Sequence, residues 1–153
     1  MKLISYEQFA KLRLRDFVPD STAIGETSDW EWMGSVWHNE GIGFTSFSRH
    51  ASTPDETGGL EISFPELPAD CIQRVLTAIG LPLRPGMSTP DVLSAMGTPS
   101  STHQFVPDRR TYDFTVGSAQ PYVVGCTVVD TEGLIHVTVV RPDLLSRGEQ
   151  NAS

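Results

Sequence analysis

Cysteine and positive charge are both scarce in this sequence. Its 153 residues include 2 cysteines, Cys71 and Cys126, and 11 Lys/Arg against 19 Asp/Glu, for a formal net charge of -8. Neither cysteine lies in a CxxC pair, so we expect two buried, reduced thiols, with a single disulfide as the alternative. The excess of acid argues against binding of nucleic acid or anionic lipid, because both need a basic surface.

Long hydrophobic runs are missing as well. No stretch approaches the roughly 20 apolar residues of a membrane-spanning helix, and the first residues, MKLISYEQFAKLRLRD, lack the apolar core of a secretory signal. We therefore expect a cytoplasmic protein with no membrane contact, although a chain trimmed of its leader would look the same. The composition is that of a folded domain. One domain is expected over 1–145, with division into 1–66 and 67–145 as the alternative, and a flexible tail over 146–153.

The familiar signatures of catalysis and metal binding are absent too. The four histidines fall in no metal-ligand spacing, and the sequence has no GxSxG elbow and no glycine-rich phosphate loop. We therefore expect no cofactor, no metal and no enzymatic activity. The alternative is an enzyme or small-molecule-binding domain whose site is assembled from distant residues, for which the candidates are His38, His50, Arg49 and Asp55.

Charge is distributed unevenly along the chain. Residues 1–70 hold twelve acidic and five basic residues, whereas residues 71–153 hold seven and six. This asymmetry indicates an acidic surface in the first half, with plain solubility as the simpler explanation. The basic pair Arg109–Arg110 is expected to be exposed to water, with anion binding as the alternative.

The stretch GMSTPDVLSAMGTP, residues 86–99, predicts a short helix with both ends marked. The Ser88 hydroxyl is placed to cap the first turn, and Met87 and Val92 have the spacing of a hydrophobic staple. Gly97 fits the position after the last turn, and a proline follows it closely.

Two further helices are expected from the same signals. Residues 67–80 carry apolar side chains at helical spacing and end at Gly80. Near the N-terminus, Ser5 and Gln8 have the spacing of a capping box, and the apolar pattern continues that helix toward Phe17.

Six segments alternate with a period of two and are predicted to be strands: 30–37, 42–48, 60–64, 110–116, 122–130 and 134–141. The turn at 130–133 joins the last two as a hairpin. The predicted order is α-βββ-αα-βββ, which indicates an α+β fold with helices packed on one face of an antiparallel sheet.

Residues 68–141 resemble a known helix–helix–sheet unit. The pattern comprises Gly-Met-Ser/Thr before a helix, Leu/Met-Gly-x-Pro after it, an aromatic strand and an aliphatic hairpin. It is similar to the SmpA/OmlA lipoproteins of the barrel-assembly machinery and to β-lactamase-inhibitor-protein-like folds. The resemblance implies binding of other proteins and not catalysis. The matching residues are Gly86, Met87, Ser88, Met96, Gly97, Pro99, Tyr112, Phe114 and 133–140.

Three tryptophans lie in DWEWMGSVWH, residues 29–38. On a strand, Trp30 and Trp32 share one face and Trp37 lies on the other. All three belong either to the core or, in part, to a partner-binding surface, since tryptophan is enriched at binding hot spots. The candidate partner-binding residues are Trp30, Trp32, Trp37, Asp29, Glu31 and Glu40.

The sequence therefore favours a non-enzymatic, acidic protein-binding or inhibitory module whose partner is a basic protein. A toxin-neutralising immunity protein is one such module, because negative potential accelerates capture of a basic target. Two alternatives stay open: the enzyme or small-molecule-binding domain described above, and an envelope-assembly scaffold like the SmpA/OmlA lipoproteins.

Overall fold

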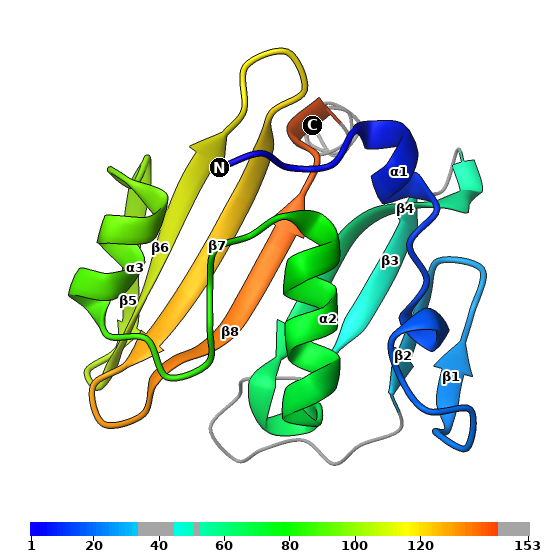
Figure 1. Ribbon diagram of the computed structural model, residues 1–153, viewed down its shortest axis with the longest axis horizontal. Coiled ribbons are helices and arrows are strands. Elements are labelled where there is room, and N and C mark those ends of the chain that lie inside the picture. Colours follow the sequence, from blue (N-terminus) through cyan, green and yellow to red (C-terminus); the bar gives the residue numbers. More distant parts are fainter. Residues whose placement is uncertain (34–44, 51–52, 144–153) are drawn as a thin grey trace.

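The computed structural model describes residues 1–33, 45–50 and 53–143, and within these ranges the chain has an α+β fold built on an eight-stranded antiparallel sheet (Figure 1). The helices are α1 (Tyr6–Ala10), α2 (Ala69–Ile79) and α3 (Thr89–Met96), with short 3-10 helices η1 (Leu14–Asp16) and η2 (Phe64–Glu66). The strands are β1 (Ile24–Glu26), β2 (Trp30–Met33), β3 (Ser46–His50), β4 (Thr53–Ser63), β5 (Ser101–Val106), β6 (Arg109–Val116), β7 (Tyr122–Val129) and β8 (Gly133–Val140).

The sheet consists of two four-stranded meanders joined edge to edge. The strand order is β1-β2-β3-β4-β8-β7-β6-β5, so the last strand of each meander lies at the centre. At this join Leu60 of β4 pairs with Val139 of β8, and Ile62 pairs with Val137. In Figure 1 helix α2 lies in front of the sheet.

The predicted element order is wrong in its strand count, because each group of three strands has a fourth. β1 is three residues long, too short to show an alternating pattern. β5 exposes all six of its residues, so it has no buried face that a period of two could reveal. The predicted strand over 30–37 is confirmed for Trp30–Met33, and its remainder lies outside the described residues.

Helix α2 confirms the prediction from apolar spacing. Five of its residues are buried, and Gly80 ends the helix with φ 93° and ψ 22°, a left-handed conformation that favours glycine. The buried residues of α2 join the main core, and they are Cys71, Ile72, Val75, Leu76 and Ile79.

Helix α3 is capped as its sequence predicts. The Ser88 hydroxyl accepts a 3.3 Å hydrogen bond from the Asp91 backbone N–H. Met87 and Val92 are both buried, as expected of a staple. Gly97 follows the last turn with φ 89°, and its N–H bonds to the carbonyl of Leu93. The short helix thus fastens apolar side chains of the 86–99 segment to the sheet.

Helix α1 has the predicted capping box between Ser5 and Gln8 but ends at Ala10, well before Phe17. The Arg13 guanidinium explains this early end, because it donates 2.8 Å hydrogen bonds to the carbonyls of Ala10 and Leu12. Those carbonyls are thereby satisfied without a further helical turn.

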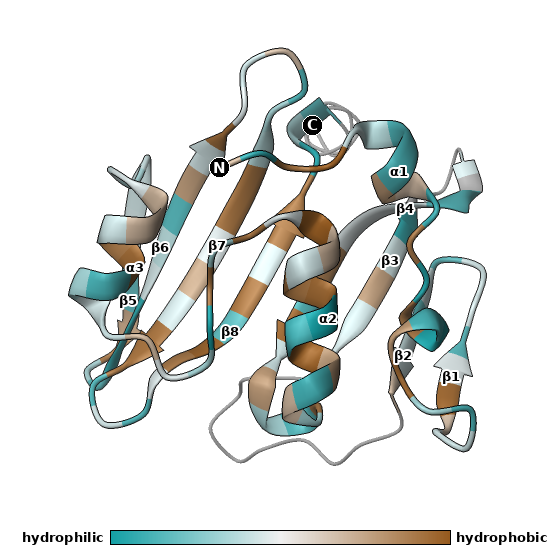
Figure 2. Cartoon of the chain, in the orientation of Figure 1, coloured by the Kyte–Doolittle hydropathy of each residue, from teal (hydrophilic) through white to brown (hydrophobic). Residues whose placement is uncertain are grey.

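One hydrophobic core lies between the sheet and the helices. Figure 2 shows brown, apolar bands alternating with paler ones along the strands and a brown stripe on α2. Alternate residues of β6, β7 and β8, among them Phe114, Val124 and Val137, are nearly inaccessible and belong to the same cluster as α2. Cys71 and Cys126 are buried and unpaired, as predicted.

Candidate functional site on the outer face of the sheet

The strand residues that alternate with the core residues form a second sheet face, here called the outer face. One row of this face crosses all eight strands through successive register pairs. From β1 to β5 along the sheet it consists of Gly25, Trp32, Ser46, Glu61, Thr138, Gly125, Asp113 and Ser101. Small and polar side chains dominate this row, whereas a neighbouring row of the same face includes Val123 and Val140.

Two tryptophans stand on the outer face at β2. Trp30 and Trp32 are each partly buried, and their rings stack with centroids 5.6 Å apart and planes at 29°. Gly25 lies beneath the Trp32 indole, where any Cβ would overlap the ring. The two rings therefore form one aromatic surface, on the shared face that the sequence predicts. Trp37 and Glu40 lie outside the described residues.

The two acids predicted beside the tryptophans have different positions. Asp29 is exposed in the turn before β2. The prediction that Glu31 binds a partner is wrong, because Glu31 is 0% exposed and points to the opposite face from the tryptophans. Its carboxylate accepts from the backbone N–H of Leu14 and pairs with Arg49 at 3.5 Å and Arg15 at 3.7 Å. Glu31 is thus a structural residue and does not belong to a partner-binding rim.

Glu61, which sequence reasoning missed, lies near the middle of the outer face. It is exposed and occupies β4, between Ser46 of β3 and Thr138 of β8. Partial desolvation raises the pKa of its carboxyl group above the ordinary value. No residue in the described part of the chain gives this carboxylate a hydrogen bond or an ion pair. Glu61 is therefore an unpaired acid on an inner strand.

Ser63 and His136 lie opposite one another in the next row. Ser63 is 0% exposed, and its hydroxyl has no hydrogen-bond partner. Burial lowers the pKa of His136 to about 4, so its imidazole is neutral at neutral pH. Buried polar groups usually have partners, so the Ser63 hydroxyl is an exception with unmet bonding capacity on this face.

We expect His136 to make stability fall as the solution is acidified. Its pKa is about 4 when folded and about 6.5 when unfolded, so below pH 6.5 the unfolded chain binds a proton that the folded chain does not. This proton uptake lowers the free energy of unfolding by about 2 kcal/mol at pH 5 and has no effect above pH 7. The measurement is urea unfolding of the wild type and of His136→Gln at pH 7.5 and pH 5. The wild type should lose more free energy of unfolding between these pH values than the variant does. Equal dependences would contradict this role, and the exposed His103, changed to Gln, is the control.

Three side chains at the β5 end form a Ser–His–Asp cluster that differs from a catalytic triad. Ser101 Oγ lies 3.2 Å from His103 Nε2, and Asp113 Oδ2 lies 2.9 Å from the same nitrogen. A triad needs the acid on one ring nitrogen and the nucleophile on the other. Ser101 also donates to Asp113 at 3.0 Å. This arrangement ties β5 to β6 and leaves Asp113 with two partners.

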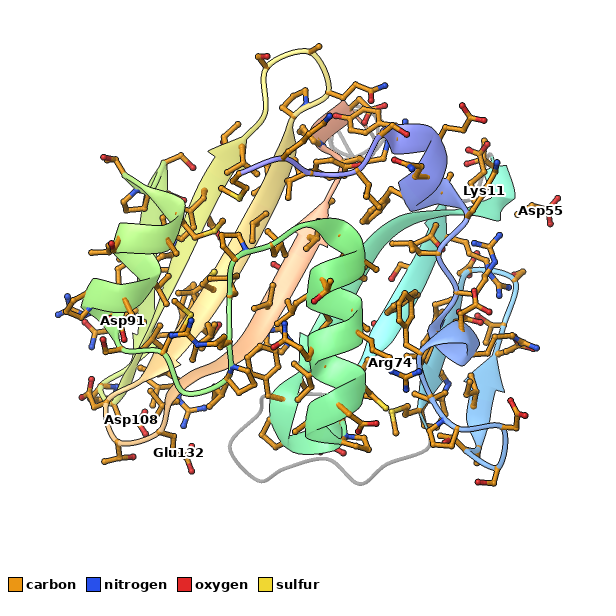
Figure 3. All side chains as sticks on the ribbon, viewed as in Figure 1. Lys11, Asp55, Arg74, Asp91, Asp108 and Glu132 are labelled. Carbon is orange, nitrogen blue, oxygen red and sulfur yellow. The ribbon has the colours of Figure 1, made fainter. Side chains whose placement is uncertain are left out.

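The other residues considered for a dispersed site do not converge. Asp55 projects from the β3–β4 hairpin, away from the sheet (Figure 3). Arg49 is engaged by Glu31 and Glu26, the latter at 3.8 Å. His38 and the side chain of His50 lie outside the described residues. Within the described ranges, no three His, Cys, Asp or Glu side chains are grouped as a metal site would require.

The predicted exposure of the basic pair in β6 is confirmed for one of its two arginines only. Arg110 is exposed, but Arg109 is buried and pairs with Asp108 at 3.0 Å, which lowers the pKa of that carboxyl group. Asp108 lies at the end of the β5–β6 hairpin (Figure 3). Arg109 is therefore engaged by its neighbour in the chain and is not exposed to water as predicted.

Comparison with known proteins identifies no relative. No protein-family model, no curated protein and no solved structure matches this chain. In the part of the chain that the structure describes, every helix is too short or too polar to cross a membrane.

Proposed function

We propose that this protein is a non-enzymatic protein-binding module that occludes a basic protein partner with the outer face of its sheet. The observation that carries the proposal is the outer face itself, which places a stacked tryptophan pair and an unpaired acid on the same side of the sheet. Aromatic residues supply most of the binding energy in many interfaces.

Charge supports a basic partner. The net charge is -8, and the surplus of acid lies in the half of the chain that contributes β1 to β4. Negative potential accelerates encounters with a basic protein and gives an association rate that falls with salt. A toxin-neutralising inhibitor of the immunity type uses this chemistry, and we infer that role as the specific form of the module.

The arrangement of the second half agrees with a binding role. Helices α2 and α3 are followed by the four-stranded meander β5 to β8. This order supports the proposed kinship with helix–helix–sheet units that act by binding proteins.

The proposal predicts that obstruction of the outer face abolishes partner capture. Ser48 and Thr115 are exposed at separate places on this face. Ser48→Arg and Thr115→Arg each add a bulky cation that repels a basic partner, so each should reduce capture at least about tenfold, a change of about 1.4 kcal/mol. The measurement is co-purification of the tagged protein with the products of its neighbouring genes.

The matched control is Gln73→Arg, which adds the same side chain at an exposed position of α2. It should capture the partner as well as the wild type does. Undiminished capture by both outer-face variants would contradict the proposed surface. Capture of none of the neighbouring products would contradict the inhibitor role.

A further inference from the structure

The two edges of the sheet differ in length and charge. One edge is β1, which is three residues long and holds Glu26 in ion pairs with Arg15 and Arg49. The other edge is β5 (Figure 1), which has six residues, STHQFV, and contains no lysine, arginine, acid or proline. Short length, charge and proline are usual means by which edge strands avoid pairing with another chain. β1 therefore has two of these protections, and β5 has none of the three.

Strand β5 is open to solvent and is also held firmly in place. All six of its residues are exposed, on both faces of the sheet. On the β6 side, the Asp113 carboxylate holds β5 through Ser101 at 3.0 Å and His103 at 2.9 Å. Because β5 is already ordered, a strand that adds to it has less conformational entropy to remove. The free backbone groups of an edge strand bind another extended strand, so the fitting ligand is a β-strand.

Exposed apolar side chains lie at the hairpin end of β5. Phe105 is 89% exposed, the largest exposed fraction of any large hydrophobic residue in the described ranges, and Val106 is 42% exposed. The Phe105 ring stacks on His103, with centroids 6.0 Å apart and planes at 6°. A register shift between His103 and Val106 interrupts the pairing with β6 at this point, as β-bulges do. The regular part of the edge, Ser101 to His103, therefore adjoins an apolar surface that nothing in the described chain covers.

From these observations we propose that the chain forms a symmetric dimer in which β5 pairs antiparallel with β5 of a second copy. Two identical strands complement one another in this arrangement, because a twofold axis sets each free N–H of one strand against a carbonyl of the other. The axis is perpendicular to the sheet, so the two eight-stranded sheets continue into one another. The inference goes beyond the proposed function, because such a dimer leaves both outer faces on the same side and open to a partner.

The distribution of charge favours a second copy as the occupant of this edge. Residues 1–70, which include β1 to β4, hold twelve acidic and five basic residues, whereas residues 71–153 hold seven and six. Four strand spacings, about 19 Å, separate β4 from β5 in each copy, well beyond the screening length of about 8 Å. Pairing through β5 therefore keeps the two acidic halves apart. A basic partner is attracted to the opposite half, so β5 offers it no charge complementarity.

The side chains of β5 suit pairing with themselves. A twofold axis sets the residues near the middle of the strand against the same residues of the second copy, where like charges would repel. The nearest acids do not prevent this approach, because Asp113 is paired with His103 and Asp108 with Arg109. With the axis near His103, Phe105 of each copy lies beside the first residues of the other β5 and is removed from water there.

The experiment is sedimentation equilibrium of the 153-residue chain over a wide range of concentrations. The average mass should rise from that of one chain to that of two and no further. Phe105→Lys places a cation at the edge, where it repels its counterpart, and should weaken the dimer at least about tenfold. The variant should keep the urea midpoint of the wild type, because the replaced ring is exposed. Gln73→Lys adds the same charge at an exposed position of α2 and should leave the dimer unchanged.

Hydrogen exchange shows which edge forms the dimer. The backbone amides of β5 should exchange more slowly at concentrations that favour the dimer than in dilute solution, and those of β1 should exchange equally in both. A chain that stays monomeric at every concentration would overturn the proposal. So would a dimer that slows exchange in β1 and not in β5, or one that Phe105→Lys leaves intact. Assemblies of more than two copies would also overturn it, because a closed twofold pairing ends at the dimer.

Discussion

Replacement of Glu31 with alanine is expected to lower the free energy of unfolding by about 3 kcal/mol, near the lower end of the cost of breaking a buried ion pair. The Glu31 side chain is 1% exposed and the Arg49 side chain 17% exposed, so the substitution leaves a mostly buried guanidinium with less counter-charge. It also removes the acceptor of the Leu14 N–H. Because Arg15 is half exposed and Arg49 keeps a contact to Glu26, the full cost is reduced by solvent and by that second acid.

The measurement is urea unfolding followed by tryptophan fluorescence. Glu26→Ala is the matched control, because it removes a carboxylate from the same two arginines at a position with 42% exposure. An exposed pair contributes at most about 1 kcal/mol, so the control should shift the midpoint much less. Equal effects of the two substitutions would show that burial of Glu31 does not strengthen this network.

Gly133→Ala is expected to cost about 3 kcal/mol, from roughly 1–2 kcal/mol of left-handed backbone strain and roughly 1–3 kcal/mol of overpacking. Gly133 begins β8 with φ 75°, and a Cβ there would overlap the carbonyl oxygen of Gly86. That contact cannot relax easily, because Gly86 and Met87 are hydrogen-bonded to Leu134 on either side of it, at 3.0 and 2.9 Å.

Gly86→Ala is the control that separates strain from collision. Gly86 also has a positive φ, 81°, but a Cβ there would meet no atom closer than 3.9 Å. It should therefore cost only the roughly 1–2 kcal/mol of the left-handed backbone. Thermal and urea unfolding should show that Gly133→Ala is less stable than Gly86→Ala. If Gly86→Ala proved as destabilising as Gly133→Ala, the overlap with the Gly86 carbonyl would not be the cause.

The sequence correctly predicts those local structures that depend on residues close to one another in the chain. The capping residues Ser5 and Ser88, the terminal Gly80 and the hairpin at 130–133 all act within a few residues, and each is found as predicted. The α1 helix was predicted too long because its end depends on Arg13, whose side chain is held by Thr57 from a distant strand. Periodicity cannot reveal a contact of that kind.

In the candidate site, too, the sequence predicts the features set by neighbouring residues and not those set by distant ones. Alternation along β2 predicts that Trp30 and Trp32 share a face, and their stacking agrees with it. The same alternation places Glu31 on the other face, but its burial depends on arginines from η1 and β3. Glu61 was missed because its position at the middle of the outer face arises from the register between β3, β4 and β8. The sequence carries no local signal for that register.

The join between β4 and β8 has a consequence for biosynthesis. While the first half of the chain emerges from the ribosome, β4 has only one of its two neighbours, since β8 follows β5 to β7 in the chain. During that interval β4 is an open strand edge, able to pair with the wrong chain. Tyr122, which packs against Phe9 and donates to the carbonyl of Ile4, also reaches the N-terminal segment late. The two halves of the sheet are thus joined only after the β7–β8 hairpin has been made.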